Sequence, residues 1–146
     1  MRRQSSRFSL LAACCASGLI AAACAAIAPE DESAAPISEL AGTRWVAQSI
    51  GGDPVAGRAP TLAFGAEDRL SGSGGCNSLT AVYETEGGAI AVRALGATER
   101  ACGDAVMQQE FAFLAVLAKA QRYEREDTRL VVTDAAGQSI VFAPRA

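Results

Sequence analysis

Histidine is absent from this 146-residue chain, and aromatic residues are scarce, with one Trp, two Tyr and five Phe. The lack of histidine excludes Ser-His and Cys-His nucleophile pairs, histidine-based zinc sites and the side chain that most often acts as acid or base near neutral pH. Chemistry by carboxylates, lysine or tyrosine remains possible. We therefore expect a protein that is not an enzyme and that needs no cofactor.

The chain also lacks a cluster of basic residues. Its formal net charge is −3, and loss of the first 24 residues, which contain three arginines, would leave about −6. An acidic domain without a basic patch argues against nucleic acid as a partner.

The N-terminus has the organisation of an export signal. Arg2, Arg3 and Arg7 precede an uncharged run over residues 8–23, which ends in small residues before Cys24. A basic start, an apolar middle and a small-residue exit predict a secretory leader. Export would place the mature protein in a compartment where cysteines form disulfides.

A bacterial lipoprotein signal ends at a cysteine that follows small residues and becomes acylated. Cys24 follows three alanines and a full-length apolar run, whereas Cys14 follows a better aliphatic position but only a short run. We predict a lipoprotein signal peptide at residues 1–24 with the lipid on Cys24, and Cys14 is the second choice. An ordinary cleaved secretory signal and a retained transmembrane helix stay open as alternatives.

The rest of the chain divides into a tether and a domain. Residues 25–39 contain two prolines and several acids without periodicity, which favours a flexible tether. Residues 40–146 form the domain. Short runs in it alternate between apolar and polar residues and predict strands, at 43–50, 61–64, 69–71, 79–84, 89–95, 129–133 and 139–143.

One segment of the domain has helical periodicity. Residues 104–122 contain no Gly or Pro, and Met107, Phe111, Leu114 and Leu117 recur at helical spacing. We therefore predict an α+β fold, with an antiparallel, strongly twisted or barrel-like sheet and one amphipathic helix over about 104–122.

The segment with most glycine, residues 70–77, could form a phosphate cradle or a tight turn. No Lys-Ser/Thr pair and no helix follow it, so we favour the turn. Cys76 and Cys102, the domain's two cysteines, could form a structural disulfide in an oxidising compartment or remain two buried thiols.

Glu110 lies on or beside the apolar stripe of the predicted helix. A buried carboxylate can be catalytic, but it more often pairs with an arginine or accepts backbone hydrogen bonds. Trp45, Tyr83 and Tyr123 could stack on a ligand, although core packing is the more common role of such aromatics.

Taken together, these residues resemble the META domain, also called the HslJ-like family of small bacterial envelope proteins. The residues that carry the resemblance are Leu-Ala-Gly-Thr-Arg-Trp at 40–45, Pro-Thr-Leu-Ala-Phe at 60–64, the Gly-x-x-Gly-Cys-Asn pattern at 72–77, Thr-x-x-Ala-Cys at 98–102, and Glu110, Phe113 and Leu117. The resemblance marks Trp45, Gly75, Asn77, Thr98 and Glu110 as structural motif residues. It also places Cys76 and Cys102 in the two hallmark segments, so we predict that they are bonded.

The resemblance implies a compact α+β domain, often behind a lipoprotein leader, with associations to stress and antibiotic tolerance and with no catalytic or metal residues to carry over. We expect a lipid-anchored protein on the periplasmic side of a bacterial membrane, with outer-membrane sorting favoured. Its partners would be the membrane and an unknown envelope protein or small ligand. The alternative function is an inhibitor lipoprotein of a cell-wall hydrolase such as lysozyme.

Overall fold

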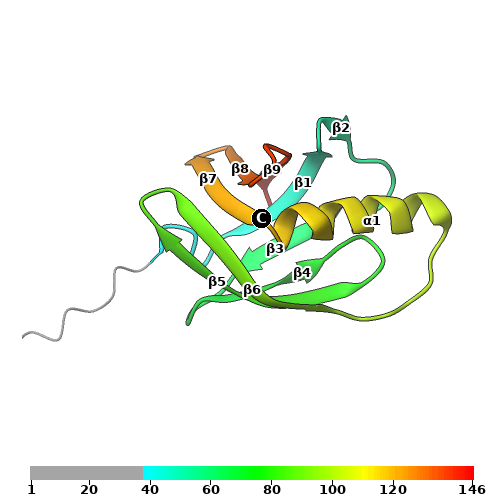
Figure 1. The fold of residues 1–146 in the computed structure, drawn as a ribbon, viewed down its shortest axis with the longest axis horizontal. Helices are drawn as coiled ribbons and strands as arrows, with labels where there is room; N and C mark the ends of the chain where they lie inside the picture. Colours follow the sequence, from blue (N-terminus) through cyan, green and yellow to red (C-terminus); the bar gives the residue numbers. More distant parts are fainter. Residues whose placement is uncertain (1–37) are drawn as a thin grey trace, which may run out of the picture. The chain divides into compact units, whose positions relative to one another are not determined.

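The computed structural model describes residues 38–146, which form nine β-strands and one α-helix (Figure 1). The strands are β1 (Arg44–Ile50), β2 (Asp53–Pro54), β3 (Thr61–Phe64), β4 (Arg69–Ser73), β5 (Ser78–Glu86), β6 (Ala89–Ala97), β7 (Ala120–Glu126), β8 (Arg129–Asp134) and β9 (Ser139–Pro144). The helix α1 (Asp104–Leu117) lies between β6 and β7 in the chain. The predicted leader, its lipidated Cys24 and nearly all of the predicted tether lie outside the described residues.

The strands form one antiparallel sheet that closes on itself. The hydrogen-bonded order is β2-β1-β3-β4-β5-β6-β7-β8-β9, and β9 also pairs with β1. The eight longer strands therefore make a closed barrel, and β2 only extends the end of β1. Closure leaves these strands without the free edges of an open sheet. The predicted α+β fold with a barrel-like antiparallel sheet is confirmed.

Alternation along the strands builds the core. In β5, Leu79, Ala81 and Tyr83 are buried while the residues between them are exposed. Because successive side chains point to opposite faces of a strand, this pattern sends one set into the barrel. The largest side chains of the core are those of Trp45, Tyr83, Phe64, Phe113 and Phe142.

The helix packs against the barrel and completes the core. It contacts β1, β8 and β9 (Figure 1), and the ring of Phe113 meets that of Phe142 edge-on, with centroids 6.2 Å apart. Gly103 is the N-cap and makes no side-chain cap, while Asp104 lies in the first turn. The negative charge of Asp104 therefore meets the positive end of the helix.

The predicted helix is too long at its C-terminal end. It ends at Leu117, and residues 120–126 form β7, which pairs with β8 over most of its length. No Gly or Pro marks this change, and only Ala120 and Tyr123 of β7 are buried. Pairing with β8 and closure of the barrel override the local helix propensity there.

The predicted apolar stripe of the helix is also wrong in part. Phe111 is 77% exposed, and the buried residues of the helix are Glu110, Phe113, Val116 and Leu117. A carboxylate thus occupies a buried position that an apolar pattern assigns to a hydrophobic residue. Its hydrogen bonds, described next, make this burial possible.

Candidate functional site

The glycine-rich turn between β4 and β5 lies against the connection from β6 to α1. A disulfide joins Cys76 of the turn to Cys102 of the connection, and their Cα atoms are 6.1 Å apart. Cys76 is buried and Cys102 is exposed. The predicted pairing is therefore present, and it ties the start of α1 to the start of β5.

Glu110, midway along α1, is buried beneath this turn. Its Oε2 accepts hydrogen bonds from the backbone N–H groups of Cys76 at 3.0 Å and Asn77 at 2.7 Å. Its Oε1 accepts one from Asn77 Nδ2 at 2.6 Å. Burial alone would raise the pKa of Glu110, but the hydrogen bonds from Asn77 and Cys76 outweigh it, so the pKa lies below its ordinary value.

Asn77 extends these contacts to the connection before the helix. Its Oδ1 accepts hydrogen bonds from Thr98 Oγ1 at 2.9 Å and from the Arg100 N–H at 2.6 Å, and its Nδ2 also donates to the Arg100 carbonyl at 3.3 Å. The side chains of Asn77, Thr98 and Glu110, with the backbone of Cys76 and Arg100, form what we call the buried polar cluster. Among the described residues, no buried side-chain polar atom lacks a hydrogen-bond partner.

Two glycines allow the turn to approach the cluster. A Cβ on Gly74 would lie 2.5 Å from the Glu110 carboxylate, closer than any real contact. Gly75 has φ +116°, and a Cβ there would lie 3.0 Å from the Arg58 carbonyl. The glycines of this segment therefore allow the backbone of a tight turn to approach its neighbours closely, which confirms the turn that the sequence favours.

The cluster is built for structure. Glu110 accepts backbone hydrogen bonds, one of the two structural roles that the sequence predicts for it, and both of its oxygens are occupied by donors of the domain. A carboxylate that must keep three such bonds is a poor proton carrier, because protonation would break at least one of them.

The three aromatic residues singled out in the sequence belong to the core. Trp45 is buried and donates from Nε1 to Thr43 Oγ1 at 2.8 Å. The ring of Tyr83 meets Phe64 edge-on at 4.9 Å, and Tyr123 is buried as well. Burial raises the pKa of both tyrosines. None of the three presents a ring surface for stacking on a ligand.

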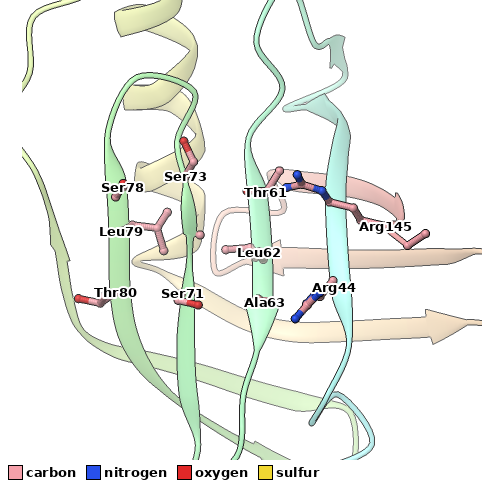
Figure 2. A pocket seen from close by; sticks show the side chains of 12 residues that line it. Arg44, Thr61, Leu62, Ala63, Ser71, Ser73, Ser78, Leu79, Thr80 and Arg145 are labelled. Carbon is pink, nitrogen blue, oxygen red and sulfur yellow. The ribbon is translucent and has the colours of Figure 1, made fainter.

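A separate hollow of about 600 Å³ lies on the outer face of β1, β3, β4 and β5 (Figure 2). Leu62 and Leu79 are buried inside the barrel, so their neighbours along the strands point outward. The strand register aligns these outward side chains in two rows, one with Thr61, Ser73 and Ser78, the other with Arg44, Ala63, Ser71 and Thr80. The floor of the hollow is therefore made of small residues, mostly hydroxyl-bearing.

Arginines stand on one side of this floor. Figure 2 shows the Arg145 side chain reaching past β1 toward Thr61, and the Arg44 side chain directed from β1 toward β3. A second hollow of about 420 Å³ shares Thr61, Ser73 and Arg145 with the first and adds Arg58. We call the two together the arginine groove.

The sequence interpretation missed this groove. The signal was the recurrence of Ser, Thr or Ala at alternate positions of three strands that are consecutive in the chain. That pattern indicates a face without large side chains, but only the strand register shows that the small residues align.

Among residues 38–146, no helix is long and apolar enough to cross a membrane. The same residues hold no group of three or more Cys, Asp or Glu side chains placed to bind a metal ion.

A family model for the META domain matches residues 38–146. The chain belongs to the META domain family. The match covers the whole barrel and its helix, and it includes both segments that meet at the buried polar cluster. A comparison with curated proteins finds no match.

Solved structures of other proteins share the fold. An NMR structure of a protein from Burkholderia xenovorans has a TM-score of 0.60 and 24% identity, covering 82% of this chain and 97% of that one. A second NMR structure has a TM-score of 0.59 and 22% identity, covering 70% and 88%. The crystal structure of a DUF4847 family protein from Bacteroides vulgatus has a TM-score of 0.55 and 14% identity, covering 72% and 94%. At these identities the likeness shows a shared fold.

The META motif residues fall into two groups in this structure. Gly75, Asn77, Thr98 and Glu110 meet at the buried polar cluster or the turn beside it. Trp45 makes no hydrogen bond to them and belongs to the core of the barrel. None of the five lines the first hollow of the arginine groove.

Proposed function

We propose that this META protein is a non-enzymatic envelope lipoprotein that acts in stress or antibiotic tolerance by binding or scaffolding. A lipid on Cys24 would hold it on the periplasmic side of a bacterial membrane, with the outer membrane favoured. The observation that carries the proposal is the Cys76–Cys102 disulfide, in a chain for which the sequence predicts an export leader at residues 1–24.

The disulfide supports export for a chemical reason. Disulfides persist in the periplasm and other oxidising compartments, while the cytosol keeps thiols reduced. The leader and the disulfide are separate features of the chain, and both favour the same compartment.

The hydrogen bonding of Glu110 supports a role without catalysis. It is the only buried glutamate among the described residues, and its acceptors are already used to hold the turn and the helix together. A binding or scaffolding role asks only for a stable barrel with an accessible surface.

The anchor is tested by labelling cells with an alkyne-bearing fatty acid. We expect label on the wild-type chain and on Cys14→Ser, but none on Cys24→Ser, because only Cys24 combines small preceding residues with a full apolar run. Mass spectrometry of the mature N-terminus gives the second readout. An unlipidated terminus at Ala26 or Pro29 would contradict the anchor.

Tolerance is tested by deleting the gene and restoring it with the wild-type chain or with Cys24→Ser. Growth is measured under heat and under envelope-active antibiotics. The proposal expects the wild-type chain to restore growth and the unanchored variant to restore it poorly. Restoration by neither form would refute it. Inhibition of purified lysozyme by the purified protein would favour the alternative of a hydrolase inhibitor.

A further inference from the structure

We propose that the arginine groove binds an anionic saccharide, that is, a sugar unit that carries a phosphate or carboxylate group. This deepens the proposed binding function, and it rests on that function only for the setting in the cell envelope. The groove is formed by strands of the described domain, so its binding chemistry can be tested whether or not the chain is lipidated.

The groove carries three arginines and no acidic side chain. The part of the chain that the structure describes forms two salt bridges, Arg69–Glu67 and Arg93–Glu84. Neither involves the groove arginines Arg44, Arg58 and Arg145, and no Asp or Glu lines either hollow. Ala146, which lines the first hollow, has a terminal carboxylate that forms no salt bridge with them. Among residues 38–146 these three guanidinium groups are thus without a salt-bridge partner, and together they create a local positive potential that attracts anions.

Two of the guanidinium groups come from adjacent places in the sheet. Arg44 is the first residue of β1, and Arg145 directly follows β9, which pairs with β1. The Arg145 N–H donates to the Arg44 carbonyl at 2.9 Å. Their side chains both extend over the groove (Figure 2). A planar guanidinium donates two parallel hydrogen bonds to a phosphate or a carboxylate, so each of these side chains can anchor such a group.

The floor beside the arginines suits the hydroxyl groups of a sugar. Thr61, Ser71 and Thr80 offer hydroxyl groups that both donate and accept hydrogen bonds, as sugar hydroxyls require, while Ser73 Oγ already accepts from the Gly75 N–H. The groove contains no aromatic ring and no long side chain on its floor, so a flat polar ring can lie on it. A volume of about 600 Å³ accommodates a small ligand, and the adjoining hollow extends the groove to a second sugar unit.

The test uses the full chain, purified in a non-ionic detergent, and amide chemical shifts measured by NMR at low salt. The probes are glucose 1-phosphate, glucuronate, glucose and inorganic phosphate. We expect glucose 1-phosphate and glucuronate to shift amides of β3 and β4 at lower concentrations than either glucose or inorganic phosphate. Added salt should weaken this binding, because the guanidinium groups are exposed.

Two sets of variants identify the groups that bind. Arg44→Ala with Arg145→Ala should weaken glucose 1-phosphate binding by about tenfold or more, because two charged hydrogen-bonding groups are lost. Arg122→Ala, on exposed β7 across the barrel, is the matched control and should bind as the wild-type chain does. Thr61→Val with Ser71→Ala should weaken binding of glucose 1-phosphate and leave that of inorganic phosphate unchanged.

Any of three results would overturn the proposal. If inorganic phosphate binds as tightly as glucose 1-phosphate, the hydroxyl floor adds nothing and the groove is not a saccharide site. If Arg122→Ala weakens binding as much as the groove arginines do, the attraction belongs to the whole surface. If no probe shifts amides near the groove, the site does not exist, and the lipid label on Cys24 still stands or fails by its own experiment.

Discussion

Replacing Glu110 by Gln tests whether the buried polar cluster holds the META domain together. The substitution keeps the shape of the side chain and removes its charge. Oε2 accepts from two backbone N–H groups and Oε1 accepts from Asn77 Nδ2. A glutamine can place its carbonyl against the backbone groups, but its NH₂ group then faces the NH₂ group of Asn77.

Asn77 cannot relieve this conflict by turning its amide. Its Oδ1 already accepts from the Arg100 N–H and its Nδ2 donates to the Arg100 carbonyl. A rotation would set donor against donor and acceptor against acceptor at Arg100, although the Thr98 hydroxyl could turn to accept. The variant therefore loses one charged hydrogen bond, weakens two others and leaves buried donors unpaired. We expect the free energy of unfolding to fall by about 3 kcal/mol, a large part of the roughly 5–15 kcal/mol of a typical domain.

The assay is urea unfolding followed by the fluorescence of Trp45, the only tryptophan of the chain and a buried one. Glu124→Gln makes the same chemical change at an exposed position of β7, and it should change the free energy of unfolding by less than about 0.5 kcal/mol. A loss below about 1 kcal/mol for Glu110→Gln would refute the argument from the cluster.

The pH dependence gives a second test of the same reasoning. The pKa of Glu110 is lowered in the folded protein from the ordinary value of 4.5, so the ionised carboxylate contributes its stability in full above that value. This contribution is lost as the pH falls below 4.5 toward the folded-state pKa. The difference between the wild-type chain and Glu110→Gln should therefore be largest near neutral pH and shrink in acid. An equal difference at both ends of the range would contradict the assignment.

Three further predictions concern stability. Cys76→Ser removes a disulfide between cysteines 26 positions apart and should lower the free energy of unfolding by about 3–4 kcal/mol. If the substitution lowers the free energy of unfolding equally when both proteins are reduced, the loss of the disulfide is not the cause. Gly74→Ala places a Cβ against the Glu110 carboxylate and should lower the free energy of unfolding by about 1–3 kcal/mol. Gly96 has open space around it, so Gly96→Ala should leave the free energy of unfolding nearly unchanged. Similar urea midpoints for the two variants would contradict the packing argument. Phe113 is fully buried, so Phe113→Ala should lower the free energy of unfolding by about 3–5 kcal/mol. Phe111 is 77% exposed, so Phe111→Ala should change it by less than about 0.5 kcal/mol. The reverse order of effects would support the apolar stripe that the sequence predicts.

The strands that could be predicted are those whose burial is one-sided and local. Along β5, β8 and β9, apolar residues alternate with polar ones because one face lies in the barrel and the other in water. The sequence does not predict strand β7, because only two of its seven residues are buried and the helix before it ends without Gly or Pro. Its strand conformation depends on β8, which comes later in the chain, and that pairing leaves no mark within β7 itself.

The helix shows a second limit of periodicity. Hydrophobic spacing assigns burial to Phe111, and it places Glu110 on or beside the apolar stripe without indicating which residues would bond to it there. The partners that allow Glu110 to be buried are 33 and 34 positions away. Their contribution can be expected only if the turn at residues 73–77 is already known to lie against the helix. The cysteine pair gave the useful signal here, because the family resemblance set both hallmark segments side by side.

The distribution of unused hydrogen-bonding capacity separates the structural residues from the candidate binding residues. A polar group inside the domain must be paired, because an unpaired buried donor or acceptor costs about 1–3 kcal/mol. The cluster around Glu110 meets that demand completely. The arginines of the groove are under no such constraint, since they are exposed and form no salt bridge with a described carboxylate.

Stability explains the positions of Asn77 and Glu110, but it does not explain three arginines above a floor of serine and threonine. Binding of an anionic saccharide would explain both the charge and the hydroxyl groups, and it predicts that replacing Arg44 and Arg145 leaves urea unfolding unchanged while binding is lost.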